Sequence, residues 1–222
     1  EPDLARPGHD LNPSQAAAAE ALGAMVGEGG FNVALLDGVT GSGKTEVYLE
    51  AVAAALARDP EAQVLVMLPE IALTQAGIAR FVERFGVEPA EWHSDIAPPV
   101  RRKTWDAVAA GRARIVVGAR SSLFLPFRRL SLIVVDEEHD GSYKQDEGFI
   151  YQARDLSVMR GKIEGAAVIL ASATPSLETL RNAETGRYRW LRLTARHGGA
   201  VLPDITLIDL KATPPEPGRW LS

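Results

Sequence analysis

Residues Gly38 to Thr45 combine three glycines, a lysine and a threonine in the pattern G-x-x-x-x-G-K-[ST]. Because glycine has no Cβ, the backbone of such a loop can turn its N–H groups toward a phosphate. The Lys44 ammonium can reach the β- and γ-phosphates of a nucleotide, and the Thr45 hydroxyl can bind Mg²⁺. We therefore predict a nucleotide site made by Gly38, Thr40, Gly41, Ser42, Gly43, Lys44, Thr45 and Glu46.

A second set of ionisable residues, Asp136-Glu137-Glu138-His139, directly follows the apolar run 130–135. Asp136 is placed to hold Mg²⁺, and Glu137 to orient and deprotonate an attacking water. Lys44, Asp136 and Glu137 are therefore the predicted catalytic residues. The alternative is a solvated acidic loop without a chemical role.

The triplet Ser172-Ala173-Thr174 follows another apolar run, 167–170. Its two hydroxyls could bond the carboxylates of Asp136 and Glu137 and sense the γ-phosphate. A serine or threonine before Pro175 is also an ordinary signal for the start of a helix.

The elements that must position these residues alternate along the chain, with short apolar runs between longer amphipathic ones. This alternation predicts an α/β fold, a doubly wound and mostly parallel sheet with helices on both faces. Such sheets bind ligands beyond the carboxyl ends of their strands, where all three motifs fall. The expected strands are 33–36, 63–68, 87–93, 114–118, 130–135, 167–170, 188–193 and 205–210, and the expected helices are 13–26, 46–58, 71–85, 99–110, 151–164 and 175–183.

Two of these segments carry more specific expectations. The helix at 71–85 is expected to bury one side, made of Ile71, Ile78, Phe81, Val82 and Phe85. The segment 140–148 is expected to be a polar loop.

Composition narrows the function classes. The 222 residues include no cysteine, which excludes disulfides and cysteine-based zinc sites within this segment. No apolar run approaches the roughly 20 residues of a membrane span, and no signal peptide is visible. We expect a cytoplasmic monomer without membrane contact. The net charge of −5 argues against a general basic coat for nucleic acid but leaves room for a local basic groove.

The ordered phosphate loop, DEEH and SAT resemble motifs I, II and III of superfamily 2 helicases. The blocks GVTGSGKTEVYL, LPEIALT, VGARSSLF, VVDEEHDGSYKQDEGFIYQARDL and ILASATPSLET are more particular. Together they resemble the bacterial primosomal helicases that restart stalled replication forks, from about Leu11 to Asp209. The resemblance implies a RecA-like P-loop lobe that uses ATP and Mg²⁺ and moves 3′→5′ on single-stranded DNA.

The resemblance also implies roles for further residues. Gln15 would recognise adenine, although its place three residues after Asn12 equally suits a capping box. The segments 68–75 and 118–122 would contact DNA, with Arg120 on a phosphate beside Ser121 and Ser122. The alternative for Arg120 is a surface charge at a strand end.

The segment 142–151 resembles the aromatic-rich loop that couples DNA contact to ATP hydrolysis in this family. Tyr143, Phe149 and Tyr151 could stack on bases while Lys144 meets a phosphate. The three aromatic residues could equally form a packed cluster under the loop. His139, Ser172 and Thr174 complete the residues expected to couple DNA to hydrolysis.

Three parts of the family pattern are missing: an N-terminal DNA-binding region, a second helicase lobe with an arginine for the ATP site, and the cysteines of a zinc-binding insertion. We therefore expect a lead-in at 1–10, the first helicase lobe at 11–202 and a linker from 203 to 222. Alone, such a lobe would be weakly active or inactive, and zinc would belong to the missing part. The family implies DNA forks and single strands, primosome proteins and single-strand-binding protein as partners.

Other functions remain open at this stage. Another superfamily 2 motor, such as a RecG-like fork-reversing translocase, would differ in accessory domains. An ATP-independent loader or DNA-binding scaffold would be signalled by degraded Lys44, Asp136 or Glu137, and all three are intact. A small-molecule P-loop kinase explains the phosphate loop but not DEEH, SAT or the aromatic loop.

Overall fold

The centre of the computed structural model, which describes residues 1–194, is a sheet of seven parallel strands. This confirms the predicted doubly wound parallel sheet. The expected strand at 205–210 and the linker from 203 lie outside the described residues. In spatial order the strands are β3 (Ala90–Trp92), β4 (Ile115–Gly118), β2 (Gln63–Met67), β5 (Leu130–Asp136), β8 (Ala167–Ser172), β1 (Val33–Gly38) and β9 (Arg189–Leu193).

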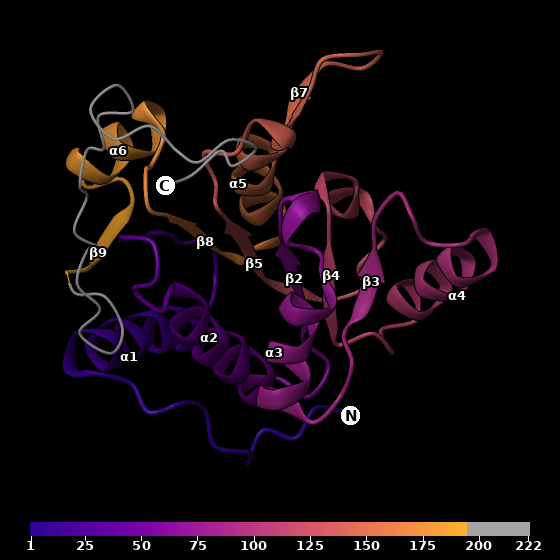
Figure 1. Ribbon diagram of the computed structural model, residues 1–222, viewed down its shortest axis with the longest axis horizontal. Helices are drawn as coiled ribbons and strands as arrows, with labels where there is room; N and C mark the ends of the chain where they lie inside the picture. The colour runs from indigo at the N-terminus through magenta and orange to yellow at the C-terminus, as the bar shows by residue number, and fades with distance from the viewer. Residues whose placement is uncertain (195–222) are drawn as a thin grey trace, which may run out of the picture.

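Helices cover both faces of the sheet, as Figure 1 shows. One face carries α1 (Pro13–Glu28), α2 (Lys44–Arg58) and α3 (Gln75–Phe85), and the other carries α4 (Pro98–Ala109) and α5 (Ala153–Glu164). Helix α6 (Leu177–Glu184), the last in the described part of the chain, lies against β1 and β9. Among the described residues, no helix is long and apolar enough to cross a bilayer.

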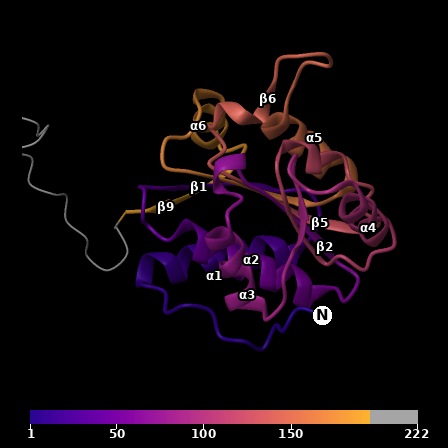
Figure 2. The same ribbon diagram turned by 45° about the vertical axis from the view of Figure 1, so that its right-hand side comes forward.

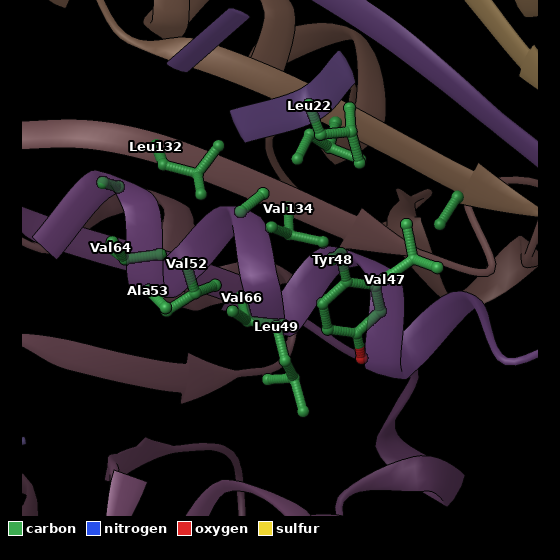
Figure 3. Packing of buried hydrophobic residues seen from close by; sticks show 14 of the residues in the cluster. Leu22, Val47, Tyr48, Leu49, Val52, Ala53, Val64, Val66, Leu132 and Val134 are labelled. Atoms are coloured by element: carbon green, nitrogen blue, oxygen red, sulfur yellow. The ribbon is translucent and has the colours of Figure 1, made fainter. Parts of the chain in front are cut away.

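The central strands read as continuous apolar runs because both of their faces are buried. In β2, Val64 and Val66 face the cluster under α1, α2 and α3, whereas Leu65 and Met67 face the opposite cluster. Figure 3 shows Val64 and Val66 packed with Val52 of α2.

The expected helix at 71–85 is shorter than predicted. Glu70–Ala72 form a single 3₁₀ turn, and α3 begins only at Gln75, where the Thr74 side chain accepts a hydrogen bond from the backbone N–H of Gly77. Ile78, Phe81 and Phe85 are buried as expected, but Ile71 is 84% exposed, so its predicted burial was wrong. The cap at Thr74 starts the helix one turn later than the apolar pattern does.

A small antiparallel hairpin replaces part of the expected polar loop and the first turn of the helix expected at 151–164. Its strands are β6 (Lys144–Gln145) and β7 (Tyr151–Gln152), and Figures 1 and 2 show it projecting away from the sheet. Two 3₁₀ turns that the sequence did not predict, η2 (Arg120–Phe124) and η3 (Gly141–Tyr143), flank its base.

Candidate active site

The phosphate loop, the acidic motif and the serine-threonine triplet meet at one edge of the sheet. β8 lies between β1 and β5, and all three strands are parallel, so their carboxyl ends are neighbours. In this register Asp37 pairs with Ser172, and Asp136 pairs with Ala171. Residues from distant parts of the sequence therefore form one site, as strands in such sheets require.

The phosphate loop has a backbone conformation that requires glycine at two positions. Gly41 and Gly43 have φ values of 78° and 80°, in the left-handed region that favours glycine. A Cβ at Gly43 would lie 2.2 Å from Nε2 of Gln15. Lys44 is almost fully buried at the start of α2, and its Nζ donates to the Gly38 carbonyl at 3.0 Å.

The loop contains a buried hydroxyl group that suits a bound phosphate. Ser42 Oγ is buried and has no hydrogen-bond partner among the described residues. A buried polar atom without a partner costs free energy, so a ligand oxygen beside it would be favourable. Together with the N-terminus of α2, which attracts anions, this loop fits a nucleotide phosphate.

Gln15 connects α1 to the phosphate loop. Its side-chain Oε1 accepts from the Asn12 backbone N–H at 2.8 Å, and the backbone N–H of Gln15 donates to Asn12 Oδ1. These two hydrogen bonds confirm the predicted capping box. Its Nε2 donates to the Ser42 carbonyl at 2.8 Å. The proposed adenine contact stays a prediction, as does a nucleotide role for Glu46, which pairs with Arg80 at 3.4 Å.

Asp136 is a half-buried carboxylate held by a tyrosine that the sequence analysis missed. Its Oδ2 accepts from the Tyr48 hydroxyl at 3.0 Å, and its Oδ1 accepts from the Glu137 backbone N–H. Burial, and then the charge of Glu137, raise the pKa of Asp136 to about 6, against the lowering effects of Tyr48 and Lys44. Tyr48 follows Lys44 by four residues on α2, and residues four apart lie on the same face of a helix. This spacing is the signal in the sequence that could have identified Tyr48. Figure 3 shows its ring among the buried residues of α2 and the sheet.

Glu137 lies between the lysine and the histidine. Its Oε1 is 3.6 Å from Lys44 Nζ, and its Oε2 is 3.7 Å from His139 Nδ1. Its φ of 46° is the only positive value of a non-glycine residue among residues 1–194. Backbone strain of this kind persists only where the surroundings hold it, and it often marks a functional site.

The Ser172 hydroxyl, expected to bond a catalytic carboxylate, is placed differently. Ser172 Oγ lies 2.7 Å from His139 Nδ1 and accepts from the Thr174 backbone N–H, so the prediction that it bonds Asp136 or Glu137 was wrong. The carboxylate that receives serine and threonine hydroxyls is Glu138, which is 0% exposed and had no predicted role. The acidic motif is therefore anchored in the fold through Glu138, unlike a solvated loop.

The predicted DNA contacts of η2 are only partly accessible. Ser122 is fully buried and its Oγ donates to the Ala119 carbonyl, so its assignment as a DNA ligand was wrong. Ser121 is exposed. Nη1 of Arg120 donates to the carbonyls of Ser142 and Lys144 at 3.1 and 2.6 Å, which ties η2 to the base of the hairpin.

The three aromatic residues of the hairpin segment divide into core and surface. Tyr143 is 0% exposed, and its hydroxyl donates to the Asp136 carbonyl at 2.7 Å and lies 3.0 Å from the Met67 carbonyl. Base stacking was therefore a wrong prediction for Tyr143. Phe149 is 78% exposed, and Tyr151 contacts both Phe149 and Phe124 through its ring. Stacking by Phe149 and Tyr151 stays a prediction, as does the phosphate contact of Lys144, whose Nζ pairs with Asp146.

Known proteins resemble this chain in sequence and in fold. The family described as DEAD/DEAH box helicase matches residues 12–183. Replication restart protein PriA of Rickettsia conorii is 50% identical over 176 residues, which cover 79% of this chain and 27% of that protein. The PriA of Haemophilus influenzae is 44% identical over 201 residues, or 90% of this chain and 27% of that protein. The chain thus spans about a quarter of the length of the curated relatives it matches. The solved structure of RecG bound to a three-way DNA junction has a TM-score of 0.59 at 20% identity, over 86% of this chain and 24% of that one, which supports the RecA-like fold.

Asp136→Asn should stabilise the nucleotide-free chain at neutral pH. The pKa of Asp136 is raised from 3.8 to about 6, so the native state binds this proton more tightly than the unfolded state does. The buried charge therefore costs stability above about pH 6, and that cost disappears as the pH falls toward 4. At 1.36 kcal/mol per pKa unit the gain is at most about 3 kcal/mol. Thermal midpoints at pH 7.5 and pH 5 should show a larger gain at pH 7.5, and a loss of stability at pH 7.5 would contradict this account.

Tyr143→Ala and Phe149→Ala should differ sharply in their effect on folding. Removal of the buried Tyr143 ring leaves a cavity beside two strand ends, and the free energy of unfolding should fall by about 3–5 kcal/mol. Removal of the exposed Phe149 ring should change it by less than about 0.5 kcal/mol. Urea denaturation of this chain measures both, and equal losses would mean that the hairpin packs as a unit with the core.

Proposed function

Because this chain belongs to the DEAD/DEAH box helicase family, we propose that it is the ATP-binding lobe of a DNA helicase that restarts stalled replication forks. The observation that carries the proposal is the convergence of Lys44, Asp136 and Glu137 beside the phosphate loop, with Lys44 Nζ 3.6 Å from Glu137 Oε1. The names of the relatives, replication restart protein PriA, support the choice of process. Primosome proteins and single-strand-binding protein are the proposed partners, and 3′→5′ is the proposed polarity.

In the proposed reaction, backbone N–H groups of the phosphate loop and of the first turn of α2 receive the phosphates of ATP. Lys44 exchanges its contacts with the Gly38 carbonyl and Glu137 for the β- and γ-phosphate oxygens. Glu137, released from Lys44, accepts a proton from the attacking water at a carboxylate oxygen. Asp136 stays oriented by the Tyr48 hydroxyl throughout.

The Thr45 hydroxyl and the Asp136 carboxylate are the residues that would hold Mg²⁺, since both are the hard oxygen donors this ion prefers. When bound, the ion neutralises charge on the β- and γ-phosphate oxygens. Within residues 1–194, no three His, Cys, Asp or Glu side chains form a metal-binding cluster, so phosphate oxygens and water would complete its coordination.

The hairpin is the proposed DNA-sensing element of the lobe. Phe149 and Ile150 are exposed at its tip, and Tyr151 supports Phe149 at a ring distance of 6.2 Å. Exposed aromatic rings stack on single-stranded bases without sequence preference. A RecG-like translocase remains the alternative, but the identity to RecG is 20% against 50% to a PriA. An ATP-independent scaffold would not need the strained backbone of Glu137 or the raised pKa of Asp136.

Lys44→Ala and Glu137→Gln should affect different steps in the full-length protein. Lys44→Ala removes the phosphate ligand, so ATP affinity should fall by about tenfold or more, the effect of a charge-assisted hydrogen bond of roughly 1.5–3 kcal/mol. Glu137→Gln should keep affinity within about twofold, while kcat falls about 10²–10⁴-fold through loss of the base. Calorimetric titration and steady-state hydrolysis separate the two, and unchanged affinity in Lys44→Ala would refute the phosphate role.

Residues 1–222 alone should hydrolyse ATP poorly and without stimulation by DNA. In related phosphoryl-transfer sites an arginine from across the cleft is worth about 10³–10⁵ in rate, and the family resemblance assigns that arginine to a second lobe. The rate of the isolated chain should therefore be about 10³-fold or more below that of the full-length protein. Robust DNA-stimulated turnover by the isolated chain would show that the site is complete within it.

A further inference from the structure

Glu138 is a fully buried carboxylate at the junction of three segments. Its Oε1 accepts from the Ser176 backbone N–H at 2.7 Å, and its Oε2 accepts from the hydroxyls of Ser176 and Thr179 at 3.1 and 3.0 Å. Ser176 is the N-cap of α6, so the carboxylate lies at the positive end of that helix. On the other side, Nη1 of Arg154 donates to Oε2 at 3.4 Å.

Arg154 connects this carboxylate to the hairpin. It is the second residue of α5, and β7 ends at Gln152, two residues before it. The guanidinium is itself buried, and it also contacts Asp155 at 2.8 Å and Glu178 at 3.9 Å. Any displacement of β7 therefore acts directly on the start of α5 and on the Arg154–Glu138 pair.

The other side of the hairpin gives a shorter but more rigid connection to the catalytic residues. From β6 the chain runs back through Tyr143, whose ring is fixed in the core and whose hydroxyl is bound to the Asp136 carbonyl. Arg120 further holds the carbonyls of Ser142 and Lys144. Movement along this side would require Tyr143 to leave the core, which is costly.

Glu138 also controls the backbone of the proposed catalytic base. It directly follows Glu137, whose φ of 46° is unfavourable, and its own N–H donates to the Ala171 carbonyl of β8 at 3.0 Å. The position of Glu138 thus fixes one end of the strained residue. Stability alone does not explain such a buried charged pair, because apolar residues of similar volume are often as stable or more so.

We propose that Glu138 and Arg154 are positioning residues that pass a displacement of the hairpin, caused by single-stranded DNA, to the proposed base Glu137. This inference rests on the proposed function. When DNA bases stack on Phe149 and Tyr151, β7 shifts the start of α5, and Arg154 pulls on the Glu138 carboxylate. The backbone of Glu137 then adjusts, and its side chain changes partners from Lys44 to the attacking water. Neither Glu138 nor Arg154 contacts nucleotide or DNA in this scheme.

The test uses the full-length protein with Glu138→Gln, Arg154→Gln and the double variant. Hydrolysis is measured against the concentration of a single-stranded oligonucleotide, together with ATP affinity and thermal midpoint. The expected result for each single variant is ATP affinity within about twofold of wild type, with the ratio of DNA-stimulated to basal hydrolysis reduced about tenfold. That reduction lies within the usual range of coupling between sites. The double variant should lose no more than the worse single variant, because both residues act in one step.

Two further variants make the comparison specific. Glu164→Gln breaks the Arg160–Glu164 pair on the same helix, whose atoms lie 2.8 Å apart without contact to Glu138, and it should keep full stimulation. Arg154→Lys keeps the charge but loses the planar fork, so it should keep part of the stimulation even if Glu138→Gln folds poorly.

Three outcomes would overturn the inference, and each leads to a different conclusion. Full DNA stimulation in Glu138→Gln and Arg154→Gln would remove the pair from the coupling route. A parallel fall in basal hydrolysis, ATP affinity and thermal midpoint would make the pair merely structural. A wild-type protein whose hydrolysis does not respond to single-stranded DNA would overturn the proposed function, and this inference with it.

Discussion

The parallel pairing of β1, β8 and β5 is the constraint on which the site depends. Because the three strands end at the same edge, Lys44, Asp136 and Ser172 become neighbours although they are far apart in the sequence. The pairing is stable because the strands are apolar on both faces, and α1, α2 and α5 cover those faces. The polar residues that follow each strand can then be positioned without contributing to the core.

The same edge carries charges whose burial is costly. The carboxylate of Asp136 is half-buried with a raised pKa, Glu137 has a left-handed backbone, and Glu138 is enclosed with Arg154. A fold selected for stability alone would avoid this combination, whereas functional sites often retain such strain. The surrounding contacts compensate by holding each group in one orientation, as the Tyr48 hydroxyl does for Asp136. Binding of a nucleotide and its ion would relieve part of the cost.

The sequence alone determined the parts of this protein that depend on local pattern. Glycine spacing predicted the loop before α2, and continuous apolar runs predicted the central parallel strands. The order of the motifs was enough to identify the family, because each motif supplies chemistry at the end of a strand. The capping box at Asn12 and Gln15 was also readable, because it joins residues only three positions apart. These features share one property: the interacting groups are close in the sequence or follow a regular period.

The tertiary structure alone decided which of the chemically suitable side chains are accessible. Composition could not separate Tyr143, which is in the core, from Phe149, which is exposed, because both follow the same strand within one polar segment. For the same reason the role of Ser122 was misjudged and Tyr48 was missed. Burial depends on strands and helices that are distant in the sequence. The contacts of Glu138 join three segments that only the packed sheet brings together. Local pattern records what a residue can do, and packing decides what it contacts.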